Sequence, residues 1–145
     1  MATFAGIVTA VAIIILSILL KKYFNRPLFA AANLVAIAFI YVGFSLKNNE
    51  AADILLESVI AAGFFFLALS GLRWKSRWIA IGIIAHGIWD IVHYNGTVIA
   101  TDIPVYWPSF CLTVDIIDGF YFLIVFERMA KKASLKPVDP SIVLF

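Results

Sequence analysis

Five apolar stretches recur along the chain, and short polar links separate them. Each is close to the length of about 20 residues, with a range of about 17–25, that a helix needs to cross the hydrocarbon core of a bilayer. Apolar residues follow one another instead of alternating with polar ones, and a spanning segment must satisfy its own backbone hydrogen bonds, so we expect helices. The predicted spans are Thr3–Leu20, Leu28–Leu46, Ile54–Leu72, Trp78–Tyr94 and Val105–Phe126.

This pattern predicts an all-α fold, a polytopic integral membrane protein with five transmembrane helices in a single bundle, ending in a basic cytoplasmic tail over residues 127–145. The composition agrees, because 63% of the 145 residues are hydrophobic, only 14% are charged and the mean hydropathy is +1.01. A soluble domain of this size leaves roughly a third of its unfolded surface exposed, which is too much for such a chain. A soluble globular enzyme, a disordered chain and a nucleic-acid-binding module are therefore excluded.

The basic residues predict the orientation. Three lie in the first link, three in the third and four in the tail, whereas the second link holds Lys47 alone and the fourth holds none. With five crossings, the first link, the third link and the tail share one side of the membrane. The positive-inside rule makes that side cytoplasmic, so we expect the N-terminus outside and the C-terminus in the cytoplasm.

Six ionisable side chains fall within the spans and do not belong in lipid. An acidic residue at the centre of a helix opposes insertion by about 2.5–3.5 kcal/mol, so several in one small protein point to a function. With a rise of about 1.5 Å per residue, they lie between the outer surface and a depth of about 18 Å. They are Glu57, His86, Asp90, His93, Asp115 and Asp118.

The spacing of these residues places them on shared helix faces. His86, Asp90 and His93 follow an i, i+4, i+7 pattern, and so do Cys111, Asp115 and Asp118 on the next span. Because a short link joins these two spans, we expect them to be antiparallel neighbours with their polar stripes facing each other. The sequence therefore predicts a polar cavity, open to the outside, between the third, fourth and fifth helices.

One interpretation of this cavity is a metal site. Imidazole and carboxylate ligands suit zinc, iron or manganese, and the spacing of Asp90 and His93 occurs in di-iron bundles. His86 and His93 are about 10.5 Å apart along the helix axis, so they do not bind a single ion together. The candidate ligands of a divalent metal are His86, Asp90, His93, Asp115 and Glu57.

A second interpretation is acid–base catalysis on a lipid-soluble small molecule. Burial in apolar surroundings favours the neutral form of a carboxyl group, which can then exchange protons near neutral pH with a histidine as partner. The candidate catalytic residues are His86, Asp90, Asp115 and Asp118. Whether the protein is an enzyme stays open, because an ion path, a transport or assembly subunit, or polar contacts that only join the helices would use the same residues.

Partners and the single cysteine complete these expectations. Membrane lipid is the expected environment, and a homodimer would bring two copies of the Asp90–His93 pair together in a two-ion site. Cys111 is the only cysteine, which excludes an internal disulfide and a cysteine-based zinc site. We interpret its side chain as a small buried apolar group.

The stretch His86–Tyr94 has the pattern H-x-x-W-D-x-x-H-[HY], and Trp107, Pro108 and Asp115 follow it. This combination resembles a family of small uncharacterised bacterial membrane proteins. The resemblance covers the last two spans. It implies a multi-span protein of the bacterial inner membrane and no established activity.

Overall fold

The computed structural model describes residues 1–48, 50–93 and 103–135, and within these ranges its regular structure is entirely helical. Five α-helices follow one another, and a short 3-10 helix extends the first. Their bounds are α1 Ala2–Leu19, η1 Leu20–Lys22, α2 Arg26–Asn48, α3 Ala51–Arg73, α4 Arg77–Val92 and α5 Trp107–Ser134. The predicted all-α fold, with one helix at each apolar stretch, is confirmed.

Four of the helices in the described part of the chain are long and apolar enough to cross a membrane: α1 with η1, α2, α3 and α5. Helix α4 has 16 residues. At about 1.5 Å per residue it rises about 24 Å, somewhat less than a hydrocarbon core of about 30 Å. The predicted end of this span, Tyr94, lies outside the described residues.

Helix α5 is longer than its apolar run. It continues past Phe126, where the predicted span ends, to Ser134, so the predicted tail begins as helix. Hydropathy marks the end of the apolar segment, but residues such as Glu127 and Lys131 are good helix formers and do not end a helix. Residues 136–145 of the predicted tail lie outside the described part of the chain.

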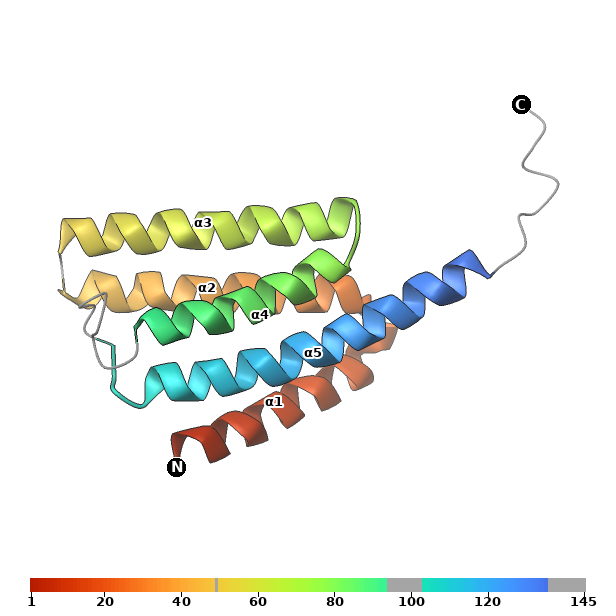
Figure 1. Cartoon of the computed structure of the whole chain (residues 1–145), viewed down its shortest axis with the longest axis horizontal. Coiled ribbons are helices and arrows are strands. Elements are labelled where there is room, and N and C mark those ends of the chain that lie inside the picture. The colour runs from red at the N-terminus through yellow and green to blue at the C-terminus, as the bar shows by residue number, and fades with distance from the viewer. Residues whose placement is uncertain (49, 94–102, 136–145) are drawn as a thin grey trace.

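The helices lie side by side along one axis, and the chain reverses direction at each link (Figure 1). Helices α2 and α3 form an antiparallel pair, α4 packs against both of them, and α5 lies between α4 and α1. Helix α4 carries the chain back from the end where α3 finishes to the end where α5 begins (Figure 1). The bundle therefore has the end of α2, the start of α3, the end of α4 and the start of α5 together at one end.

The surface and interior of this bundle reverse the usual distribution of polarity. Large apolar side chains such as Phe4, Leu19 and Phe66 are exposed, while charged side chains are buried inside. The described basic residues of the first and third links lie at the opposite end of the bundle from the α2–α3 connection (Figure 1). An apolar exterior suits a lipid environment, in which burial of polar groups depends on contacts within the bundle.

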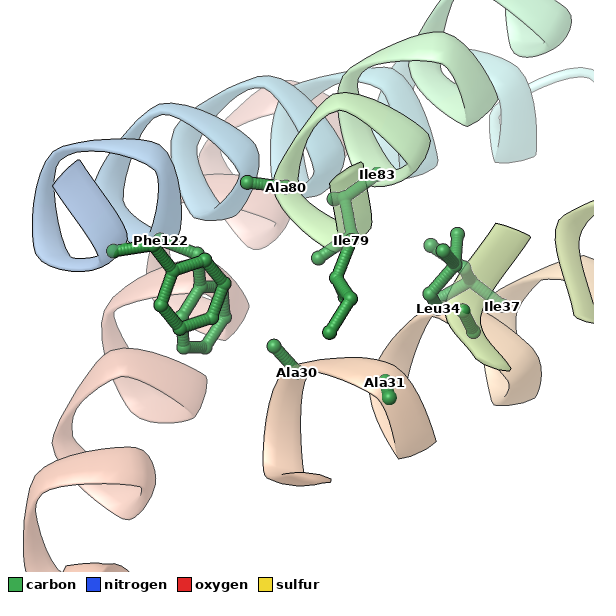
Figure 2. Close-up of a cluster of buried hydrophobic side chains, with 10 residues drawn as sticks. Ala30, Ala31, Leu34, Ile37, Ile79, Ala80, Ile83 and Phe122 are labelled. Carbon is green, nitrogen blue, oxygen red and sulfur yellow. The ribbon is translucent and has the colours of Figure 1, made fainter. Parts of the chain in front are cut away.

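Buried apolar side chains form a core (Figure 2), which lies at the end of the bundle where α2 and α4 begin. Small side chains of α2 and α4 let these two helices approach each other. On α5, the rings of Phe122 and Phe126 stack with their centroids 5.8 Å apart. The buried members are Ala30, Ala31, Leu34, Ile37, Ala68, Ile79, Ala80, Ile83, Phe122 and Phe126. Close packing at this end holds α4 and α5 in a definite register.

Gly119 permits the close contact between α4 and α5. A Cβ atom at this position would lie 2.5 Å from Cγ1 of Ile84 and 3.2 Å from its backbone nitrogen. We therefore expect Gly119→Ala to lower the free energy of unfolding in detergent by about 1–3 kcal/mol through overpacking. Gly43→Ala is the matched control, because no atom lies within 4 Å of its Cβ position. Equal stability of the two variants would contradict this account.

Candidate metal centre

The six ionisable residues predicted inside the membrane are all buried, with at most 4% of each side chain exposed. They come from three helices and gather in the half of the bundle opposite the apolar core. Helix α3 contributes Glu57, α4 contributes His86 and Asp90, its C-cap is His93, and α5 contributes the remaining two. The prediction that these helices turn their polar stripes toward the interior is confirmed.

The polar half continues the same helix faces that form the apolar core. On α4 the buried face changes from apolar to polar along the series Ile79, Ile83, His86, Asp90 and His93. On α5 it changes in the opposite direction along the series Cys111, Asp115, Asp118, Phe122 and Phe126. Because the two helices are antiparallel, polar residues meet polar residues and apolar residues meet apolar ones.

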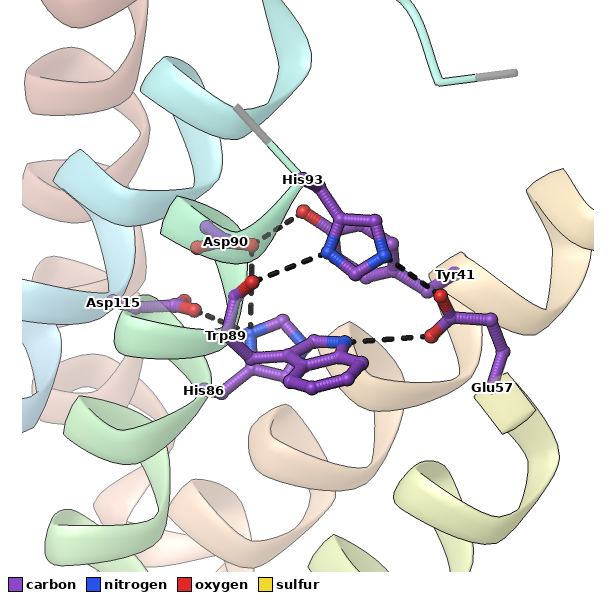
Figure 3. A network of polar contacts seen from close by, with 7 residues as sticks. All are labelled: Tyr41, Glu57, His86, Trp89, Asp90, His93 and Asp115. Carbon is purple, nitrogen blue, oxygen red and sulfur yellow. Dashed lines mark hydrogen bonds and ion pairs between the residues drawn. The ribbon is translucent and has the colours of Figure 1, made fainter. Parts of the chain in front are cut away.

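His86 and Asp115 form the central contact between α4 and α5 (Figure 3). His86 Nδ1 and Asp115 Oδ2 are hydrogen-bonded at 2.6 Å, and the same nitrogen lies 3.9 Å from Asp90 Oδ1. Tyr41 on α2 donates its hydroxyl proton to Asp90 Oδ1 at 2.5 Å. Two acids and one imidazole thus converge from two helices, and a third helix orients one of the acids.

Four side chains around this contact have the geometry of a metal-ligand group. One donor atom each from His86, Asp90, Cys111 and Asp115 can be chosen so that all lie within 4.8 Å of one another. With metal–ligand distances of about 2.0–2.3 Å, the donors of a tetrahedral ion are about 3.3–3.8 Å apart. Small side-chain adjustments would therefore bring the four donors around one ion.

Several polar atoms of this group and of the neighbouring Asp118 have no hydrogen-bond partner among the described residues. They are His86 Nε2, Asp90 Oδ2 and Asp115 Oδ1, together with both carboxyl oxygens of Asp118. A buried polar group without a partner costs about 1–3 kcal/mol. These nitrogen and oxygen atoms are therefore available to bind a cation or protons.

The charges of the site are also unbalanced. Within the described part of the chain, the ion pairs of its acids are to His86 and His93 only. Four carboxyl groups therefore face two imidazoles, and even two imidazolium ions would leave two negative charges. Isolated buried charges are very costly, so bound cations or protons must supply the remaining positive charge.

His93 and Glu57 form a separate, fully bonded pair. His93 Nε2 lies 2.7 Å from Glu57 Oε1, and its Nδ1 lies 3.1 Å from the carbonyl oxygen of Trp89. A carbonyl only accepts, so Nδ1 carries a proton, and one further proton is shared between Nε2 and Glu57. Trp89 Nε1 donates to the other carboxyl oxygen at 3.4 Å. The structure does not bring this pair into the four-residue ligand group.

Two members of the site were missed by sequence reasoning. Tyr41 reaches Asp90, and its ring lies 4.6 Å from that of His93 and 5.6 Å from that of His86. An aromatic residue near the end of a span reads as an interfacial residue. The predicted burial of Cys111 is confirmed, but its place in the ligand group was not predicted, although its i, i+4 spacing from Asp115 puts both on one face.

The predicted opening of the cavity to the outside stays a prediction, because residues 94–102, between α4 and α5, lie outside the described part of the chain. The polar side chains are packed against one another and are at most 4% exposed. Asp118 is buried on the same face of α5 as Asp115 but is not part of the four-residue group. Aromatic rings close the cluster, because Phe64 meets His86 with centroids 5.2 Å apart and Trp89 meets His93 at 5.1 Å.

Comparison with known proteins identifies a family without assigning an activity. The model of DUF6010, described as a family of unknown function, matches residues 1–128. The predicted resemblance to an uncharacterised family is thus confirmed, and it extends from the last two helices to all five. No curated protein and no solved structure matches the chain.

The hydrogen bond from Tyr41 to Asp90 makes a testable contribution to stability. We expect Tyr41→Phe to lower the free energy of unfolding in detergent by about 1–2 kcal/mol, because a buried acid loses its donor. Tyr121→Phe is the control, since Tyr121 packs against Phe122 and its hydroxyl has no partner among the described residues. An unchanged denaturation midpoint for Tyr41→Phe would contradict this role.

Proposed function

Because the chain belongs to the DUF6010 family, whose function is unknown, its activity has to be inferred from its own site, and we propose that it is an integral membrane protein that binds a divalent metal ion inside the bundle. The ligands are His86, Asp90, Cys111 and Asp115. The observation that carries this proposal is the convergence of these four donors, two of them acids, in a buried site.

The charge of the site supports a cation. As metal ligands His86 is neutral and Cys111 is a thiolate, so the four-residue group carries three negative charges. A divalent ion would offset two of them. It would also use oxygen atoms of Asp90 and Asp115 that have no partner among the described residues. In apolar surroundings these two contributions are larger than in water, because little solvent screens the acids.

The donor set restricts the choice of metal. One imidazole, one thiolate and two carboxylates suit zinc or iron(II). Manganese prefers oxygen ligands, so it is the alternative that fits a set with one sulfur less well. Four protein ligands in a tetrahedron would complete the coordination of zinc. An ion with five or six ligands would keep open positions, which a substrate oxygen would need in a metal-dependent reaction.

The remaining polar residues support the ligands. Tyr41 orients Asp90 through its hydroxyl, and such contacts to ligand side chains commonly change metal affinity by about 10–100-fold. Glu57 and His93 satisfy each other within one chain. A second copy of the chain is therefore not needed to complete the ligand set, in contrast to the two-ion dimer that the Asp90–His93 spacing suggested.

We further propose five membrane crossings, with the N-terminus outside and the basic end of the bundle in the cytoplasm, as in the bacterial inner membrane. The path of the chain supports five, because α4 returns it to the end of the bundle where α5 starts (Figure 1). Small side chains and buried polar contacts let α4 pack among its neighbours even though it is short.

Reporter fusions in a bacterial host test this topology. Green fluorescent protein fused after Phe145 should fluoresce, and alkaline phosphatase at the same place should be inactive, because the C-terminus is cytoplasmic. Phosphatase inserted after Glu50, in the link between α2 and α3, should be active. An active phosphatase at the C-terminus would contradict the proposed orientation. Reporters that place both termini on one side of the membrane would indicate four crossings and would contradict it as well.

Metal analysis of the purified protein in detergent tests the proposed site. After exposure to zinc, iron(II) or manganese and removal of the free ion, the wild type should retain about one ion per chain. We expect His86→Ala, Asp90→Asn and Asp115→Asn to bind at least about tenfold more weakly, because each removes a ligand. Cobalt(II) in the site should show thiolate charge-transfer absorption that Cys111→Ser abolishes.

Two buried acids outside the ligand group provide matched controls. Glu57→Gln and Asp118→Asn remove the same kind of group from the same half of the bundle, and they should retain more metal than Asp90→Asn and Asp115→Asn. Monodisperse elution in size-exclusion chromatography shows that each variant is folded. Metal-free wild type, or equal loss in ligand and control variants, would contradict the metal site and leave protons as the neutralising charge.

A further inference from the structure

An apolar groove runs along the outside of the bundle between α3 and α4, next to the polar cluster. Its volume of about 340 Å³ lies within the range of small-molecule sites. Gly63 lies at an exposed point of its α3 wall, where no atom is found within 4 Å of a Cβ position. The lining residues are Val59, Ile60, Gly63, Phe64, Leu67, Ala85, Ile88, Trp89 and Val92.

Two aromatic residues of the groove are also the wall of the polar cluster. Phe64 lines the groove, and its ring meets the His86 ring with centroids 5.2 Å apart. Trp89 lines the groove as well, and it contacts His93 through its ring and Glu57 through a long hydrogen bond of 3.4 Å. A single layer of side chains therefore separates an apolar binding surface from the candidate metal ligands.

The charge near this wall restricts what the groove can hold. The acids of the cluster exceed its imidazoles, and no lysine or arginine is among the described residues that line the groove. A phosphate or carboxylate group would face an excess of acids, whereas an uncharged oxygen would avoid that penalty and could share the long Trp89 Nε1 hydrogen bond with Glu57. The suitable occupant is a long apolar chain that ends in an uncharged oxygen.

We propose that the α3–α4 groove binds a long-chain alcohol or carbonyl compound and presents its oxygen to the site through the Phe64–Trp89 wall. The ligand enters laterally from the hydrocarbon core, which suits a cluster whose polar groups are at most 4% exposed. This inference deepens the proposed function and rests on it for the chemistry of the site, but binding in the groove itself requires no metal. Access from lipid would give the ion or its histidine a lipid-soluble substrate.

Photolabelling in phosphatidylcholine vesicles tests the groove. The probe is hexadecanol carrying a diazirine, and labelled peptides are identified by mass spectrometry. We expect labelling of α3 and α4 that excess unlabelled hexadecanol removes. Gly63→Leu fills the groove from an open position, so it should weaken this binding at least about tenfold, whereas Gly43→Leu, equally open on α2, should leave it unchanged.

Two outcomes would overturn the inference. If unlabelled hexadecanol does not reduce the labelling, the probe has only contacted the protein from bulk lipid. If Gly63→Leu and wild type are labelled equally, the groove is not the binding site. Metal content, measured on the same preparations, tests the proposed function separately. With cobalt(II) bound, hexadecanol should also shift the absorption of the wild type and of Gly43→Leu, but not that of Gly63→Leu.

Discussion

Neutralising the acids inside an apolar bundle is the constraint on which the rest of this structure depends. Four carboxyl groups are buried in the described part of the chain, and their ion pairs there are with two imidazoles. Neither lipid nor the surrounding side chains can stabilise so many negative charges. The site therefore requires bound positive charge, and the four residues of α4 and α5 whose donor atoms lie together are where we propose a divalent cation.

The fold divides this bundle into a packed half and a chemical half. Both halves use the same buried faces of α4 and α5, which change from apolar to polar along each helix. The apolar half holds the helices in register through close contacts, such as that of Gly119 with Ile84. Because rigid packing at one end determines the positions of side chains at the other, the polar half can keep donors that bind no partner within the bundle.

The two histidines show how differently the bundle treats similar side chains. His93 has both ring nitrogens engaged, by Glu57 and by the Trp89 carbonyl, so it has no free position for a ligand. His86 has one nitrogen against Asp115, while the other has no partner among the described residues. This asymmetry is the reason why the proposed site uses His86 as a ligand and His93 only as a supporting residue. It also places the unused nitrogen in a ring that packs against Phe64, a residue of the lateral groove.

Composition and periodicity by themselves determined the helical class, the five apolar segments and the buried faces of α4 and α5. Spacings of four and seven residues align side chains on one face whatever the neighbours are, so the approach of His86 to Asp115 followed from two stripes and a short link. The end of α5 at Ser134 could not be predicted from hydropathy, because the residues after the apolar run are polar but still favour a helix.

Only the tertiary structure decided which residues from separate helices meet. Tyr41 reaches Asp90 because α2 packs against α4, and Cys111 joins the ligand group because α5 approaches α4 closely at that height. It also separated Glu57 and His93 from His86, and it packed the polar side chains closely against one another. Periodicity specifies the direction of a side chain around its own helix. The distance between two side chains depends on the crossing and register of whole helices, which many long-range contacts set together.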